Sequence, residues 1–148
     1  MKIGIANDHH GYKLKCKLRD YLEKKNYQVI DYGSDNEETV DYPDYAFKIG
    51  RGVAHKQIDY GILICGSGIG MSIACNRVAG ARCAKVNNKK EAYLTRNDNN
   101  ANVIAISGQL SFMQAKKIIC TFINTKYSNL ERHNRRLQKI DSYKTNEY

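Results

Sequence analysis

Hydrophobic residues in this chain occur as short apolar runs that alternate with stretches of helical spacing. The apolar runs predict strands at residues 2–7, 27–32, 59–65, 81–86 and 102–106. Between them, apolar residues recur at intervals of three and four, as at Leu14, Leu18 and Leu22, which is typical of amphipathic helices. Strands alternating with helices predict the α/β class: a three-layer α/β/α sandwich with a five-stranded parallel sheet, Rossmann-like in organisation.

The ends of the predicted strands locate a candidate site. In open parallel sheets, ligands bind at the carboxyl ends of the strands. Residues 8–11, 65–70 and 107–109 follow the first, third and fifth strands, so we expect them to converge. Residues 96–102 precede the fifth strand. The sequence leaves open whether this segment lies at the other end of that strand or across from it.

The segment 60–76 carries the most informative pattern. Its apolar strand ends on Cys65, continues through Gly-Ser-Gly-Ile-Gly at 66–70, and resumes with helical spacing at Met71. Such a turn directs several backbone N–H groups toward one point and commonly holds an anion. We expect Cys65 on the lip of this loop, where positive potential favours the thiolate. The arrangement suits a reaction in which a substrate acquires negative charge. The alternative is a buried structural thiol.

The composition limits the partners. The chain has 148 residues, with 24 basic and 15 acidic side chains and a net charge of +9. This size predicts one domain, over residues 1–140, with a tail at 141–148 that may fray. The charge favours anionic partners, either phosphorylated metabolites or nucleic acid. No recognition helix or aromatic platform supports nucleic acid, so we expect a small phosphorylated molecule.

The cysteines and the apolar runs indicate the compartment. Five cysteines without a C-x-x-C pair argue against a disulfide framework or a zinc knuckle and favour a reducing cytoplasm. No Cys/His cluster has metal-ligand spacing, so we expect neither metal nor cofactor. No apolar run approaches the roughly 20 residues of a membrane span, and the first residues resemble a strand rather than a signal peptide, so we expect no membrane association.

Five motifs together resemble a known family. They are DHHGYKLK at 8–15, DYPDYA at 41–46, ICGSGIGMSIACN at 64–76, RNDNNANV at 96–103 and ERHNRR at 131–136. In order and spacing they are similar to the type B ribose-5-phosphate isomerases, a group that also includes allose- and galactose-6-phosphate isomerases. The resemblance extends from the first strand to about residue 140.

The resemblance implies an aldose–ketose isomerase that interconverts ribose 5-phosphate and ribulose 5-phosphate through an enediolate. It makes Cys65 the general base and gives Ser67 the role of moving a proton between the two substrate oxygens. The oxyanion would be stabilised by Asn99 and by the backbone N–H groups of the glycine loop, including Gly66, Gly68 and Gly70. Donors aimed at developing charge contribute about 3 kcal/mol each.

The resemblance also implies how the substrate is held. Asp8 and His9 match the sugar-binding pair, and Tyr42 lines the same pocket. Arg132, His133 and Arg136 match a phosphate clamp that reaches the active site of a neighbouring subunit in a homodimer or homotetramer. The four-residue spacing of Arg132 and Arg136 lets both project together from a helix.

Two positions depart from the family pattern. Asp98 stands where the family has a histidine that opens the sugar ring, and Gln109 stands where it has an arginine that contacts phosphate. An aspartate is anionic at neutral pH and is no cationic donor, so a catalytic role for Asp98 would be weakened. His10 is a hypothetical replacement for the missing imidazole.

Other interpretations stay open at this stage. One is an isomerase of hexose 6-phosphates such as allose or galactose 6-phosphate, and another is a sugar-phosphate-binding protein with weakened catalysis. At single positions, Asp8 could cap the first helix, Asp41 could cap the second, and His133 could belong to a solvated basic helix. Asp98 could be an ordinary loop residue.

Overall fold

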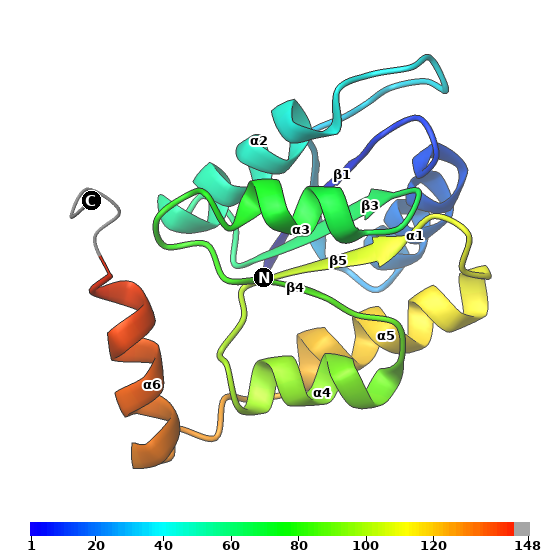
Figure 1. Cartoon of the computed structure of the whole chain (residues 1–148). Helices are drawn as coiled ribbons and strands as arrows, with labels where there is room; N and C mark the ends of the chain where they lie inside the picture. The colour runs from blue at the N-terminus through cyan, green and yellow to red at the C-terminus, as the bar shows by residue number, and fades with distance from the viewer. Residues whose placement is uncertain (144–148) are drawn as a thin grey trace.

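The computed structural model describes residues 1–143, which form a sheet between two layers of helices (Figure 1). The strands are β1 (Lys2–Asn7), β2 (Gln28–Asp31), β3 (Tyr60–Cys65), β4 (Cys83–Lys85) and β5 (Val103–Ser107). The helices are α1 (Tyr12–Lys24), α2 (Tyr42–Ala54), α3 (Ile69–Cys75), α4 (Lys89–Asn97), α5 (Phe112–Asn124) and α6 (Glu131–Asp141). The elements alternate along the chain as the apolar pattern predicted.

All four strand pairings are parallel, in the order β2-β1-β3-β5-β4. The predicted α/β fold with a five-stranded parallel sheet is therefore confirmed. From β1, the chain first adds β2 on one side and then β3 on the other. Such a reversal is where open α/β sheets bind ligands, at the carboxyl ends of the two central strands. In this chain, Asp8 and Gly66 follow those two ends directly.

Two apolar layers explain why the strands read as continuous hydrophobic runs. Helices α1, α4 and α5 cover one face of the sheet, where Ile62 and Ile64 are completely buried. Helices α2 and α3 cover the other face, where Leu63 and Met71 are completely buried. Successive residues of a strand point to opposite faces, so a strand covered on both faces needs apolar residues at every position.

Helix α6 stands apart from the two layers, beyond the end of the sheet opposite to the arrowheads of β3 and β5 (Figure 1). Its last residue, Asp141, accepts two hydrogen bonds from Nη1 of Arg82, at 3.0 and 3.2 Å. The predicted frayed tail therefore does not begin at residue 141, which is helical. The rest of that prediction falls largely on residues 144–148, outside the described residues.

Side chains before the helices decide some helix starts. The side chain of Asn88 accepts the Glu91 N–H at 2.9 Å and caps α4. Asp41 precedes α2 without forming a capping hydrogen bond.

Within residues 1–143, no helix is long and apolar enough to cross a membrane. The same residues contain no group of three or more His, Cys, Asp or Glu side chains placed to hold a metal ion.

Candidate active site

The loops after β1, β3 and β5 pack directly against one another, as predicted. The Asp8 N–H donates to the Ile64 carbonyl at 3.0 Å, and the Gly108 N–H donates to the Cys65 carbonyl at 2.7 Å. A methyl group on Gly108 would lie 2.5 Å from the His10 carbonyl oxygen, so only glycine allows the first and third loops to approach this closely. The carboxyl edge of the sheet therefore forms one continuous site.

Cys65 lies beneath the glycine loop at this edge. Its sulfur accepts a hydrogen bond from the Gly68 N–H at 3.1 Å. Gly68 has φ of 80°, a left-handed conformation that turns its N–H back toward the end of β3. Only 4% of Cys65 is exposed, so it is deeper than the lip position that we expected. A backbone donor on a shielded sulfur stabilises negative charge there.

Ser67 is exposed beside Cys65, and its Oγ accepts the Ile69 N–H at 3.2 Å. The loop below it is fixed by Ser107, whose Oγ donates to the Gly66 carbonyl at 2.7 Å. The two side chains Cys65 and Ser67 therefore each engage one backbone N–H of the loop. The anion receptacle inferred from the sequence is partly occupied by the protein's own side chains.

The predicted sugar-binding residues surround this loop. Asp8 is buried, and its Oδ1 accepts the His10 N–H at 2.9 Å instead of capping α1, whose N-cap is Gly11. The rings of His9 and His10 lie 4.1 Å apart. Exposed His10 also borders the loop, because a Cβ on Gly66 would be 3.4 Å from its ring.

Tyr42 covers the far side of the same loop. A Cβ on Gly70 would lie 2.7 Å from the Tyr42 Cζ, so this glycine makes room for the aromatic ring. Tyr42 remains 40% exposed. The exposed Gln109 follows β5 and donates its backbone N–H to the Ser107 Oγ at 3.1 Å. One chain thus brings together eight of the predicted site residues: Asp8, His9, Tyr42, Cys65, Gly66, Ser67, Gly68 and Gly70.

Asp98 and Asn99 are not part of this group within one chain. They connect α4 to the start of β5, where Val103 pairs with Gly61, whereas Ser107 at the other end pairs with Cys65. Four residues of strand span about 13 Å. The expectation that Asn99 joins the glycine loop is therefore wrong within a single chain. Asn99 precedes the start of β5, and the glycine loop lies beside its end.

His133 also departs from its predicted role. Helix α6 places it on the same side as Leu137, four residues later, so the imidazole is only 7% exposed. Its Nε2 lies 3.9 Å from Oδ1 of Asp98 and has no hydrogen-bond partner within residues 1–143. Arg132 and Arg136 are exposed on the same helix. His133 therefore faces Asp98 of its own chain instead of joining the two arginines.

Lys15 was missed by the sequence reasoning. It is 1% exposed, and its Nζ donates to Oδ1 of Asp31 at 2.9 Å and to the Ser34 carbonyl at 2.7 Å. These bonds anchor the segment that leads to Tyr42. The available signal was its position: Lys15 lies three residues before Leu18, on the apolar side of α1.

Comparisons with known proteins identify relatives of this chain. The family model described as Ribose/Galactose Isomerase matches residues 3–140. A putative sugar phosphate isomerase of Bacillus subtilis is 37% identical over 145 residues, covering 97% of each chain.

Solved structures of similar fold and sequence are also known. Ribose 5-phosphate isomerase B of Thermotoga maritima superposes with a TM-score of 0.93 at 43% identity, covering 96% of this chain and 98% of that chain. The enzyme of the same name from Mycoplasma genitalium, solved with bound ribulose-5-phosphate, gives a TM-score of 0.90 at 37% identity, covering 95% and 93%. With the family model matching nearly its whole length, the chain belongs to the ribose/galactose isomerase family.

Proposed function

We propose that the protein interconverts ribose 5-phosphate and ribulose 5-phosphate, with Cys65 as the general base. The observation that carries the proposal is the Cys65 sulfur, held by the Gly68 N–H at the carboxyl edge of the sheet. Family membership and the ribulose-5-phosphate bound to the Mycoplasma genitalium relative support the reaction and the substrate. All five cysteines are free, which supports a thiol chemistry in a reducing compartment such as the cytoplasm.

The proposed reaction moves one carbon-bound proton. In the open-chain aldose, the Cys65 thiolate removes the proton from C2, and the electron pair forms an enediolate with the C1 carbonyl. The thiol then returns the proton to C1, which leaves the ketone at C2. Ser67 transfers the hydroxyl proton from O2 to O1, for which its exposed hydroxyl beside Cys65 is suitably placed.

The glycine loop would stabilise the negative charge first on the sulfur and then on the substrate. The Gly68 N–H stabilises the sulfur while it is anionic. As the proton moves to sulfur, the negative charge passes to the substrate oxygens, where we propose that the loop donors at Gly66, Gly68 and Gly70 hold it. Burial of Cys65 strengthens these interactions, because water competes less in a shielded site.

The phosphate-binding arginines and part of the catalytic set would come from a second copy of the chain. Asp98 and Asn99 lie between α4 and β5, and helix α6, which carries Arg132 and Arg136, lies beyond the end of the sheet opposite to the arrowheads of β3 and β5 (Figure 1). Both arginines are exposed on one helix and available to another molecule. We therefore propose a homodimer or homotetramer in which this end of one copy completes the site of the next, with the arginines on the phosphate.

Opening of the cyclic sugar needs a proton donor, and Asp98 stands where the family has a histidine for this step. We propose that His10 supplies the imidazole, because its exposed ring borders Gly66 and lies 4.1 Å from the ring of His9. His10→Ala should then slow the conversion of cyclic ribose 5-phosphate far more than the exchange of the C2 proton in the open form. A normal rate on the cyclic sugar would remove His10 from the mechanism.

The main test compares Cys65→Ala with Cys75→Ala, a completely buried thiol in α3. NMR would follow the conversion of ribose 5-phosphate and the exchange of its C2 proton in deuterated water. We expect Cys65→Ala to lose both while still binding substrate, and Cys75→Ala to retain both. Exchange that survives in Cys65→Ala would exclude this base.

The same measurements on the wild-type protein test the two alternative functions. Wild type that binds ribose 5-phosphate but never exchanges its C2 proton would indicate a binding protein. Faster turnover of allose or galactose 6-phosphate would indicate a hexose enzyme.

A further inference from the structure

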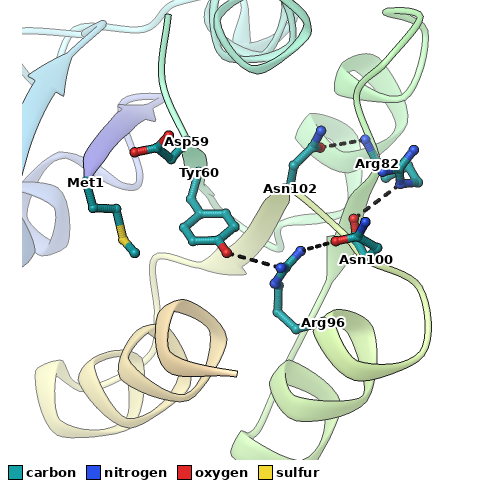
Figure 2. A pocket seen from close by; sticks show the side chains of 7 residues that line it. All are labelled: Met1, Asp59, Tyr60, Arg82, Arg96, Asn100 and Asn102. Carbon is teal, nitrogen blue, oxygen red and sulfur yellow. Dashed lines mark hydrogen bonds between the residues drawn. The ribbon is translucent and has the colours of Figure 1, made fainter. Parts of the chain in front are cut away.

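A second cavity lies at the opposite edge of the sheet from Cys65. It has a volume of about 550 Å³ and opens at the amino ends of β3 and β5 (Figure 2). Seven residues line this basal pocket, among them Tyr60, Arg82, Arg96 and Asn100. None of these four residues has a role in the proposed isomerisation.

Arg96 is a buried cation without an anionic partner. It is 6% exposed and lies over the rings of Tyr60 and Phe122, with Cζ 4.8 and 5.8 Å from their centroids. Within residues 1–143, no carboxylate lies within 4.0 Å of its guanidinium. Burial lowers the pKa of Arg96. A buried charge without a counter-ion is costly, so an anion that reached it would be stabilised.

The hydrogen bonds of Arg96 go to neutral acceptors only. Its guanidinium donates to Oδ1 of Asn100 at 2.9 Å and to the Tyr60 hydroxyl at 3.1 Å (Figure 2). It also donates to the Ala101 carbonyl at 2.5 Å. Its buried Nε has no hydrogen-bond partner within residues 1–143. The guanidinium is therefore fixed in place, and one of its N–H donors is still without an acceptor among these residues.

The rest of the pocket also has more donors than acceptors. The Asn100 side chain accepts from Arg96 through its oxygen, and its amide nitrogen has no acceptor among the described residues. Tyr60 likewise accepts from Arg96, and its own hydroxyl hydrogen has no acceptor there. Arg82 is oriented by Asp141 and by the Asn100 carbonyl. A single carboxylate, Asp59, lines the pocket, and its Oδ2 already accepts the Lys2 N–H at 2.7 Å.

We propose that the basal pocket binds a small oxyanion, the phosphate or carboxylate group of a metabolite, between Arg82 and Arg96. A guanidinium donates two parallel hydrogen bonds to a pair of oxygens of a carboxylate or a phosphate, and the pocket sets two such cations beside neutral donors. The cavity is larger than a bare ion, so a small organic molecule that carries the group also fits. The pocket lies at the opposite edge of the sheet from Cys65, and its lining residues are not among those placed in the proposed active site.

The test follows the Nε–H signals of the arginines by NMR during titration with inorganic phosphate, and separately with acetate. The protein carries Arg132→Ala and Arg136→Ala, which removes the proposed phosphate clamp. We expect the Arg82 and Arg96 signals to shift along a saturating curve with at least one of the two oxyanions, and not with chloride at equal ionic strength. The stronger of the two responses identifies the group that the pocket prefers.

Tyr60→Phe keeps the ring under Arg96 and removes one hydrogen-bond donor, so it should weaken binding of the oxyanion several-fold. Tyr93→Phe, at an exposed tyrosine of α4, is the matched control and should leave binding unchanged. Arg96→Lys keeps the charge but loses the fork and should weaken binding tenfold or more. Unmoved signals, shifts that chloride reproduces, or equal binding by Tyr60→Phe and the control would each overturn the proposal. None of these results depends on isomerase activity.

Discussion

Lys15 illustrates how one side chain can support a site that it does not touch. Its Nζ is enclosed at the end of β2, where it bonds Asp31 and the Ser34 carbonyl. This places the segment after β2 and, through it, the start of α2 at Tyr42. The charge is tolerated inside the protein because both acceptors are well placed, and removing it would leave Asp31 poorly paired.

We expect Lys15→Met to lower the free energy of unfolding by about 3 kcal/mol, the lower part of the range for a broken buried pair, because Arg19 still contacts Asp31. Lys13→Met is the control. Lys13 pairs with Glu37 at 3.0 Å, but its side chain is 80% exposed, so the change should stay within about 0.5 kcal/mol. Urea unfolding measures both. Equal losses in the two variants would contradict this view of Lys15.

At the scale of elements, α1 and α5 pack side by side on one face of the sheet, joined partly by Tyr21 and Cys120. The Tyr21 hydroxyl lies 3.3 Å from the Cys120 sulfur. This hydrogen bond, together with burial, raises the pKa of Tyr21 to about 12. The contact therefore exists with a neutral phenol and is weakened when the phenol ionises.

The sign of the pH effect follows from the raised pKa. The unfolded chain ionises Tyr21 near pH 10, about two units below the folded protein. The stabilisation is complete below pH 10 and is lost as the pH rises to 12. We expect Tyr21→Phe to remove this part of the alkaline destabilisation, measured by thermal unfolding from pH 9 to 12. The phenolate absorbance of wild type should also show one extra late-titrating tyrosine. Identical alkaline profiles would rule out this contact.

At the scale of the whole molecule, the proposed catalytic set is divided between the two ends of the sheet. Cys65 lies at the carboxyl edge, and Asp98 lies at the start of β5. In the oligomer that we propose, two copies share each site, and each copy gives one end of its sheet. Isolated monomers should therefore be inactive.

Mixing two inactive variants tests this division. Cys65→Ala lacks the base, and Arg132→Ala with Arg136→Ala lacks the clamp. In a randomly mixed dimer population, half of the dimers are mixed and one of their two sites is intact, so about a quarter of the wild-type activity should return. Native mass spectrometry would verify that mixed oligomers form. Mixed oligomers without activity would place all the catalytic groups in one chain.

Much of the candidate site was predictable because it follows strand ends that are encoded locally. The apolar run before Cys65 and the glycines after it determine a strand, a tight loop and a helix start from their own spacing. The convergence of Asp8 with this loop then follows from the general behaviour of parallel sheets. Lys15 escaped notice because a lysine in a helix is ordinarily taken as solvated, and only its partner Asp31, on another element, makes its burial possible.

The sequence by itself determined the order of the elements, the α/β class and the identity of the loop that holds Cys65, since these depend on patterns among near neighbours. The tertiary structure alone decided that Asn99 lies at the opposite end of β5, that His133 turns inward to Asp98, and that Arg96 borders a second pocket. Those facts depend on contacts between residues far apart in the chain, and a local pattern carries no information about which distant partner a side chain will meet.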